Sequence, residues 1–174
     1  MSVFPLTDGG YFEPGYDDVT WATYEVDYDV VRAAGAAFEV LLDYINLHGV
    51  RMQAPVIVEP KNGKCTVSFK LAEDSGEMEA ALATDEAKRA VLKHKNKEIR
   101  RVVVVRYKKV SFAAVRFSWW ISVKSVNEQL NRLRALIRER GVKADPERYI
   151  VCQFNWPFTW PMFRHNEIRI PIMS

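Results

Sequence analysis

The sequence predicts an α+β fold in which two helices pack on a curved antiparallel sheet or open barrel. Two segments have the apolar period and the end signals of helices, and β-rich runs lie on either side of each. The order strand-strand-helix-strand-strand occurs twice, at an offset of roughly ninety residues. At 174 residues the chain is long enough for one domain with a substantial core. We therefore expect a single domain over residues 1–174.

The first helix is expected over Val30–Leu47, where Gly49 can supply the left-handed residue that follows a helix end. Roughly half of its circumference or more is apolar, whereas a helix that lies on one sheet needs a stripe of only about 100°. The excess has to be covered by a loop of the chain, by a partner chain or by a ligand. The polar positions of this helix are Arg32, Gly35, Glu39, Asp43 and Asn46.

The second helix is expected over Val126–Arg140 and stops at Gly141. Ser125 and Glu128 have the spacing of a capping box at its start. Its pattern is that of an ordinary amphipathic helix with one buried stripe. The stripe consists of Val126, Leu130, Leu133 and Ile137.

Runs of β-branched and aromatic residues predict the strands. The turn signal Lys61-Asn62-Gly63 predicts a hairpin between the second strand and the third. Residues 72–98 separate the two halves and are expected to form a surface insertion, with a helix from Thr84. The predicted strands are Thr20–Tyr28, Pro55–Pro60, Lys64–Leu71, Ile99–Tyr107, Ser111–Trp119, Arg148–Phe154 and Asn166–Ile172.

Charge is unevenly distributed, although the net charge is only +3. Residues 1–29 contain seven acids and no Lys or Arg, whereas residues 88–109 contain ten Lys or Arg and the single acid Glu98. The basic stretch could face an anionic partner, or it could be a solvated surface. Because Lys93–Arg101 within this stretch has almost no interleaved aromatic residues, stacking on single-stranded nucleic acid gets little support.

Cys65 and Cys152 occur singly in apolar runs and are expected to be buried thiols in a reducing compartment. No apolar run approaches the ~18 residues of a membrane span, and the N-terminus lacks a signal-peptide pattern. We expect a cytoplasmic protein; a removed organelle transit peptide would leave no trace in this sequence.

Catalytic motifs are absent from the sequence: it contains no GxSxG, HExxH, P-loop or GxGxxG pattern. We therefore expect neither an enzyme nor catalytic residues. His48, His94 and His165 are too scattered to predict a metal site by spacing. His48, just past the end of the first helix, is the histidine expected nearest to a groove beside that helix.

The stretch RYIVCQFNWPFTWPMFRHNEIRIPI, residues 148–172, resembles the signature of the SOUL/haem-binding-protein family. In that family a strand leads into a proline-rich loop, then Arg-Arg-Asn-Glu and a last apolar strand. WATYEV, RMQAPV and AAVRFSW resemble further landmarks, and all follow in the family's order over residues 12–172. The resemblance implies a pseudo-twofold repeat of ββαββ that forms a distorted antiparallel β-barrel flanked by two helices. It also implies a relationship to gyrase-inhibitor-like effector-binding domains.

The resemblance further implies non-enzymatic binding of haem or a related tetrapyrrole in an apolar groove beside the first helix, for transport or buffering. The alternative is a small-molecule-sensing or protein-interaction module of the same fold that does not bind haem. His48 is the nearest possible axial ligand, and Trp119 could fill the groove or form a stacking wall. The other expected groove residues are Phe38, Val40, Leu41, Leu42, Ile45 and Met52.

Several positions depart from the family pattern. His165 replaces the second Arg, Gln53 replaces the Thr of Met-Thr, and Trp119 replaces the Gly of Phe-Ser-Gly. In the family, basic residues on the first helix could pair with the haem carboxylates. The corresponding positions in this chain are Gly35 and Asp43, and neither is basic. The basic cluster of residues 88–109 could substitute for them only if it folds near the groove.

The aromatic loop before the last strand is expected to be a brace. Its prolines would stiffen it, its rings would pin it to the barrel, and its polar residues would satisfy backbone groups where the strand begins. These residues are Pro157 and Pro161; Phe158, Trp160 and Phe163; and Arg164, Asn166 and Glu167.

Overall fold

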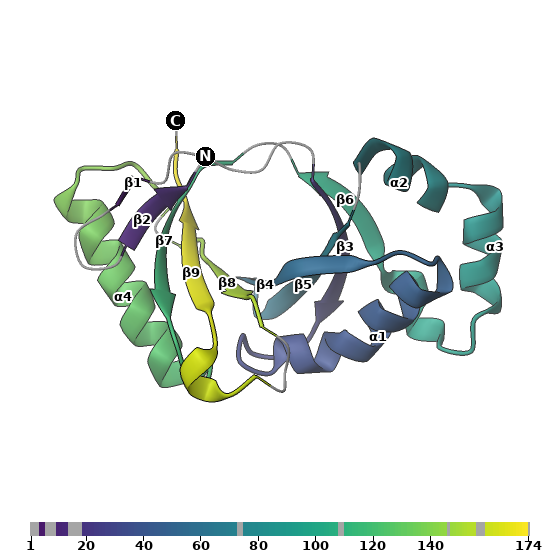
Figure 1. Cartoon of the computed structure of the whole chain (residues 1–174), viewed down its shortest axis with the longest axis horizontal. Helices are drawn as coiled ribbons and strands as arrows, with labels where there is room; N and C mark the ends of the chain where they lie inside the picture. The colour runs from purple at the N-terminus through teal and green to yellow at the C-terminus, as the bar shows by residue number, and fades with distance from the viewer. Residues whose placement is uncertain are drawn as a thin grey trace. The chain divides into compact units, whose positions relative to one another are not determined.

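The computed structural model describes residues 4–5, 10–13, 19–72, 75–107, 110–145, 147–155 and 159–173 (Figure 1). The chain forms two compact units: unit 1 joins residues 1–16 to residues 109–174, and unit 2 comprises residues 17–108. Both units combine antiparallel strands with helices, so the predicted α+β class is confirmed.

Unit 2 is built on an antiparallel sheet with the strand order β4-β5-β3-β6. In this sheet β3 (Val19–Val26) pairs with β5 (Lys64–Leu71) on one side and with β6 (Val103–Tyr107) on the other. β4 (Met52–Lys61) completes the sheet beside β5. Helix α1 (Ala33–Leu47) packs against β3, β5 and β4 (Figure 1).

The predicted hairpin between β4 and β5 is confirmed. Asn62 and Gly63 both have positive φ angles, 53° and 76°, and Lys61 pairs with Lys64 across the turn. Two consecutive residues with positive φ are the requirement of a type I′ turn, which Asn-Gly meets at low cost.

Helix α1 ends where the sequence predicted but begins later. Gly49 has a φ of 64°, and the backbone N–H of Val50 donates to the carbonyl of Ile45, which closes the helix end. The first helical residue is Ala33. The Asp29 carboxylate accepts hydrogen bonds from the backbone N–H groups of Val31 and Arg32, so these residues form a turn ahead of the helix.

The insertion contains more structure than the sequence predicted. The expected helix is α3 (Asp85–Lys93), and the Thr84 hydroxyl accepts from the N–H of Ala87 at its start. Helix α2 (Ser75–Leu82) was not predicted. The 3-10 helix η2 (Lys97–Arg101) occupies the start of the predicted strand Ile99–Tyr107, because its turn buries the Ile99 side chain completely.

The strands of unit 1 lie in the antiparallel order β1-β2-β7-β9-β8. Helix α4 (Val123–Glu139) packs against β7 and β9 (Figure 1). The sequence did not predict β1 or β2. The strands are β1 (Phe4–Pro5), β2 (Gly10–Glu13), β7 (Phe112–Phe117), β8 (Ile150–Gln153) and β9 (Asn166–Pro171).

Helix α4 begins three residues earlier than predicted because a different serine caps it. Ser122 is the N-cap, and its capping box is completed by Ser125 rather than by Glu128. The predicted end is correct, since Gly141 has a φ of 64°.

Each unit repeats the sequence strand-helix-strand-strand, as β3-α1-β4-β5 and as β7-α4-β8-β9. In each unit the first of these strands pairs with the last. The pseudo-twofold relation, the closure into a barrel and the single domain stay predictions. Cys65 and Cys152 are buried thiols that form no disulfide, as expected.

The aromatic loop is a brace only in part. Arg164 Nε donates to the Thr159 carbonyl at 3.0 Å, and Asn166 Nδ2 donates to the Trp119 carbonyl at 2.9 Å. However, Trp160 and Phe163 are exposed and do not pin the loop. The 3-10 helix η3 (Pro161–Phe163) forms the tip of this loop, and Trp160 is its N-cap. The predicted brace residues Pro157 and Phe158 lie outside the described residues.

Candidate functional site

Helix α1 buries a broad face within unit 2. At about 100° per residue, its buried positions span an arc of roughly 140°. This arc packs on the sheet and on η2. The buried residues are Ala33, Ala37, Val40, Leu41, Tyr44 and Ile45. Val40, Leu41 and Ile45, three of the expected groove residues, are thus core residues in this structure, and a ligand on the surface of α1 would not touch them.

The accessible apolar residues of the expected groove lie at one flank of this buried face. Phe38 and Leu42, one turn apart on α1, are both half-buried. The Phe38 ring meets the buried Phe69 ring of β5 edge-on, at a centroid distance of 5.6 Å. Met52, at the start of β4 opposite Leu71, is also half-buried.

His48 caps the C-terminal end of α1, where its ring meets the Tyr44 ring edge-on at 4.7 Å. Its Nε2 atom is buried and has no hydrogen-bond partner in the described part of the chain. Burial lowers the pKa of His48, so the imidazole is neutral near pH 7. A neutral imidazole nitrogen is a common iron ligand, but this atom becomes accessible only if the end of α1 opens.

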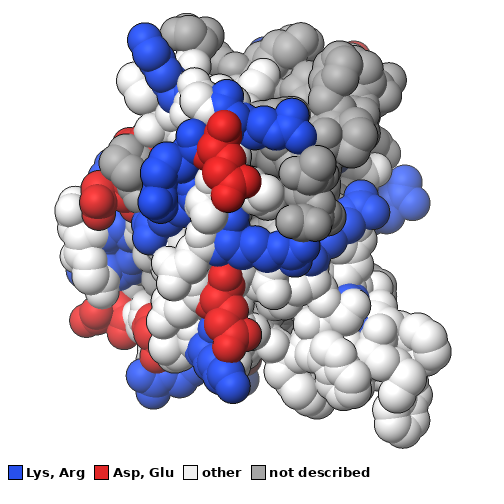
Figure 2. All heavy atoms as spheres, turned by 90° about the vertical axis from the view of Figure 1, so that its left-hand side faces the viewer, with Lys and Arg blue, Asp and Glu red and all other residues white. Residues whose placement is uncertain are grey.

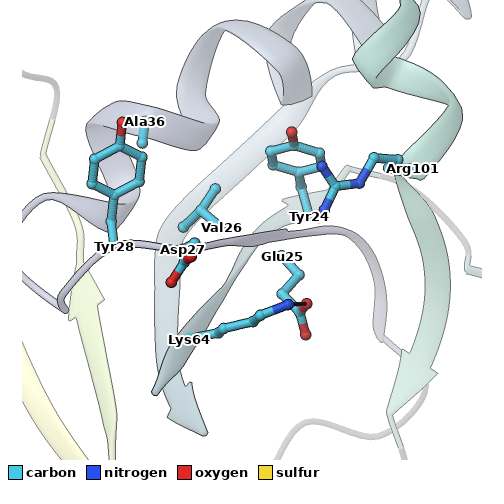
Figure 3. Close-up of a pocket in the computed structure, with 8 residues that line it drawn as sticks. All are labelled: Tyr24, Glu25, Val26, Asp27, Tyr28, Ala36, Lys64 and Arg101. Carbon is cyan, nitrogen blue, oxygen red and sulfur yellow. Dashed lines mark hydrogen bonds and ion pairs between the residues drawn. The ribbon is translucent and has the colours of Figure 1, made fainter. Parts of the chain in front are cut away.

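A cavity of about 230 Å³ lies at the opposite flank of α1, on the side of Ala36 (Figure 3). Figure 3 shows the Tyr28 ring beside Ala36 and the Arg101 guanidinium at the Tyr24 ring. None of the residues expected from the sequence lines this cavity. Its lining consists of Tyr24, Glu25, Val26, Asp27, Tyr28, Ala36, Lys64 and Arg101.

Three of the four charged side chains that line the cavity form ion pairs. Lys64 Nζ lies 3.1 Å from Glu25 Oε1, and Arg101 lies 3.1 Å from Glu98 Oε2. The Tyr24 hydroxyl donates to the same Glu98 oxygen at 2.6 Å. Burial, and then this hydrogen bond, raise the pKa of Tyr24, while the bonds from Tyr24 and Arg101 lower the pKa of Glu98.

Part of the basic cluster does fold beside α1. Arg101 lines the cavity, and Asn96 Nδ2 donates to the Asp43 carboxylate of α1 at 2.9 Å. The chain's own insertion therefore covers one flank of the wide apolar face. No sequence signal marked this cavity, because it forms only when η2 reaches a helix that lies more than fifty residues earlier.

Trp119 belongs to unit 1, whereas the other expected site residues belong to unit 2. Its side chain is exposed and its φ angle is 75°. This is the left-handed region, which favours glycine because glycine has no Cβ. The geometry explains why the family pattern has Gly at this position.

Buried charges in β9 form a satisfied cluster. The Glu167 carboxylate accepts from Arg169 at 2.9 Å, from Arg116 at 3.2 Å and from the His165 ring at 2.7 Å. The Arg169 guanidinium lies 4.3 Å from the Phe112 ring centroid. With these partners, Glu167 is accounted for as a structural group.

A family model described as SOUL heme-binding protein matches residues 6–171, nearly the full chain. The chain belongs to the SOUL haem-binding protein family. This confirms the resemblance drawn from the C-terminal signature and the earlier landmarks. No curated protein matches this SOUL chain.

Solved structures similar to this SOUL chain show its fold. The C-terminal domain of EcmrR has a TM-score of 0.68 at 8% identity, with 95% of this chain and 97% of that chain covered. An uncharacterized conserved protein from Listeria innocua has a TM-score of 0.65 at 10% identity, with 93% and 92% covered. A hydrolase from Listeria innocua has a TM-score of 0.65 at 11% identity, with 93% and 91% covered. At these identities the likeness concerns the fold alone.

Among the described residues, no group of three or more His, Cys, Asp or Glu side chains could hold a metal ion. None of the helices they form has both the length and the apolar character to cross a membrane.

Proposed function

We propose that this SOUL-family chain binds haem or a related tetrapyrrole without catalysing a reaction on it, and that it serves transport or buffering. The match of the family model to residues 6–171 carries the proposal. The half-buried apolar flank of α1 supports it, since Phe38 and Leu42 offer a surface that one face of a flat apolar ring can cover.

The ring would lie on α1 rather than inside the cavity. A volume of about 230 Å³ is below the ~300–1,000 Å³ of typical ligand pockets, and charged groups line it. Contact would be made by Phe38, Leu42 and Met52. His48 is the side chain that could supply an axial nitrogen, but its burial favours binding without that ligand.

A hemin titration followed in the Soret band tests the proposal. We expect a saturable shift at micromolar hemin. Leu42→Glu should weaken it about tenfold or more, because it removes an apolar contact and adds a charge to the flank. Asn127→Glu adds the same charge on an exposed position of α4 and should change nothing. The absence of a saturable shift in the wild-type protein would overturn the proposal.

The cavity favours a second candidate, a sensor of a small molecule. Its two tyrosine rings and paired charges suit a compact ligand with an apolar body and polar ends. In that case the protein is indifferent to hemin but retains a small molecule in native mass spectrometry. Ala36→Phe, which fills the cavity from α1, would abolish that retention. If hemin instead binds at the opposite flank, as in the first proposal, the same variant would leave that binding intact.

A further inference from the structure

Large apolar side chains gather on one exposed surface of unit 1. Six of the twelve large apolar side chains that are exposed in the described residues belong to two short segments, residues 119–123 and residues 160–163. Each is more than half exposed, from 54% for Met162 to 72% for Trp160. We call this surface the aromatic patch; its members are Trp119, Trp120, Val123, Trp160, Met162 and Phe163.

The two segments of the aromatic patch are bound to each other. The backbone N–H of Trp119 donates to the Pro161 carbonyl at 2.8 Å, and its carbonyl accepts from Asn166 at 2.9 Å. The Arg164 guanidinium lies 4.3 Å from the Trp120 ring centroid. The backbone of the patch is therefore fixed while its rings face solvent.

The surroundings of the aromatic patch are basic. Residues 110–127 and 148–166 contain no Asp or Glu. They do contain Arg116, Lys124, Arg148 and Arg164. Two acids just outside these ranges lie close to two of them: Glu167 is 3.2 Å from Arg116, and Glu128 is 3.9 Å from Lys124. Figure 2 looks onto the side of unit 1 that carries α4: blue basic and red acidic side chains alternate across it, and an uncharged white lobe projects at the lower right. The lobe projects from the surface rather than forming a hollow.

Trp119 gives an independent sign that the patch serves a purpose other than folding. With a φ of 75° it occupies the left-handed region, which is unfavourable for any residue with a Cβ. Most of its side chain contacts solvent, so packing offsets little of that cost. Strain of this kind points to a role for the side chain.

We infer that the aromatic patch docks on the surface of a lipid bilayer that carries anionic headgroups. Tryptophan and other amphipathic or apolar side chains enter the interfacial layer, while neighbouring Lys and Arg attract anionic lipid. A stable protein interface takes about 20–30 residues a side, whereas this patch has six members and is bounded by Ser118, Ser122 and Thr159. A small apolar patch with basic side chains beside it suits an interfacial layer better than a protein interface.

Vesicle binding of the full chain tests the inference. The probes are phosphatidylcholine vesicles with and without phosphatidylserine, and binding is read by sedimentation and by the tryptophan emission. We expect binding to the phosphatidylserine vesicles with a blue shift, because Trp119, Trp120 and Trp160 leave water. The double variant Trp160→Ser/Phe163→Ser should bind these vesicles at least about tenfold more weakly than the wild type. Lys124→Glu should weaken binding to anionic vesicles roughly fivefold and leave the neutral vesicles unaffected.

A matched control is available in unit 2. Leu92→Ser/Val103→Ser removes two apolar side chains that are 58% and 56% exposed, near the basic cluster of residues 88–109. It should bind vesicles like the wild type, and urea unfolding should show both double variants folded. Wild-type protein that ignores anionic vesicles would overturn the inference, as would equal binding by the patch variant. Self-association that the patch variant abolishes, without vesicle binding, would assign the surface to a second copy of the chain instead.

Discussion

Replacing Trp119 by glycine should leave the protein more stable than replacing it by alanine. Both variants lose the same indole contacts, so their difference isolates the backbone at a φ of 75°. Alanine in the left-handed region costs roughly 1–2 kcal/mol, whereas glycine there costs only its extra unfolded-chain entropy, about 0.5–1 kcal/mol. The net advantage of glycine is therefore about 0.5–1 kcal/mol.

Urea unfolding followed by circular dichroism measures this difference directly, and thermal unfolding should place the glycine variant about 1–4 °C higher. Ser118, the preceding residue, is the control. It is not among the described residues with positive φ, so alanine there should be more stable than glycine. If Trp119→Ala is as stable as Trp119→Gly, the strain assigned to this residue does not exist.

Three further predictions concern stability. Arg164→Ala should lower the free energy of unfolding by about 1–2 kcal/mol, because it removes the hydrogen bond to Thr159 and the contact with Trp120. The hemin affinity should stay within about twofold of the wild-type value. A larger effect on hemin affinity than on the melting temperature would assign the loop to ligand binding. Arg169→Met should lower the free energy of unfolding in urea by about 3–5 kcal/mol, since it leaves the buried Glu167 carboxylate short of a partner. A loss below about 1 kcal/mol would show that Arg116 and His165 are enough to stabilise that carboxylate. Because burial lowers the pKa of His48, the unfolded chain takes up its proton first as the pH falls through about 6.5. Stability should therefore be full above that pH and decrease below it, and more so in the wild type than in His48→Gln; equal loss in both proteins would contradict the assignment.

Local signals predicted the parts of the fold that depend on near neighbours. The glycine ends of both helices, the Asn62-Gly63 turn and the helix start at Thr84 all rest on hydrogen bonds that close within a few residues. The errors at helix starts are also local. Asp29 and Ser122 both have side chains that can cap a helix. Asp29 instead closes a turn ahead of α1, and Ser122 rather than Ser125 caps α4, so the sequence pattern misplaced the first turn of both helices.

The candidate site was predicted less well. The width of the apolar face of α1 was read correctly, and the structure divides that face into a core arc and two flanks. Leu41 and Ile45 are branched aliphatic residues of α1 like Leu42, yet Leu41 and Ile45 are buried and Leu42 is half-buried. Periodicity gives the direction of a side chain, but it does not tell what lies opposite.

By itself, the sequence determined the class of the fold, the places where its helices end, and the family, because these depend on local hydrogen bonding, hydrophobic period and the order of short motifs. The tertiary structure alone decided which flank of α1 the insertion covers, where the cavity lies, and that the rings of residues 160–163 face solvent rather than pin the loop. These features depend on contacts between segments that are far apart in the chain, such as Asn96 with Asp43 and Trp119 with Pro161. A local pattern does not contain such contacts, since they form only when the sheet has brought the segments together.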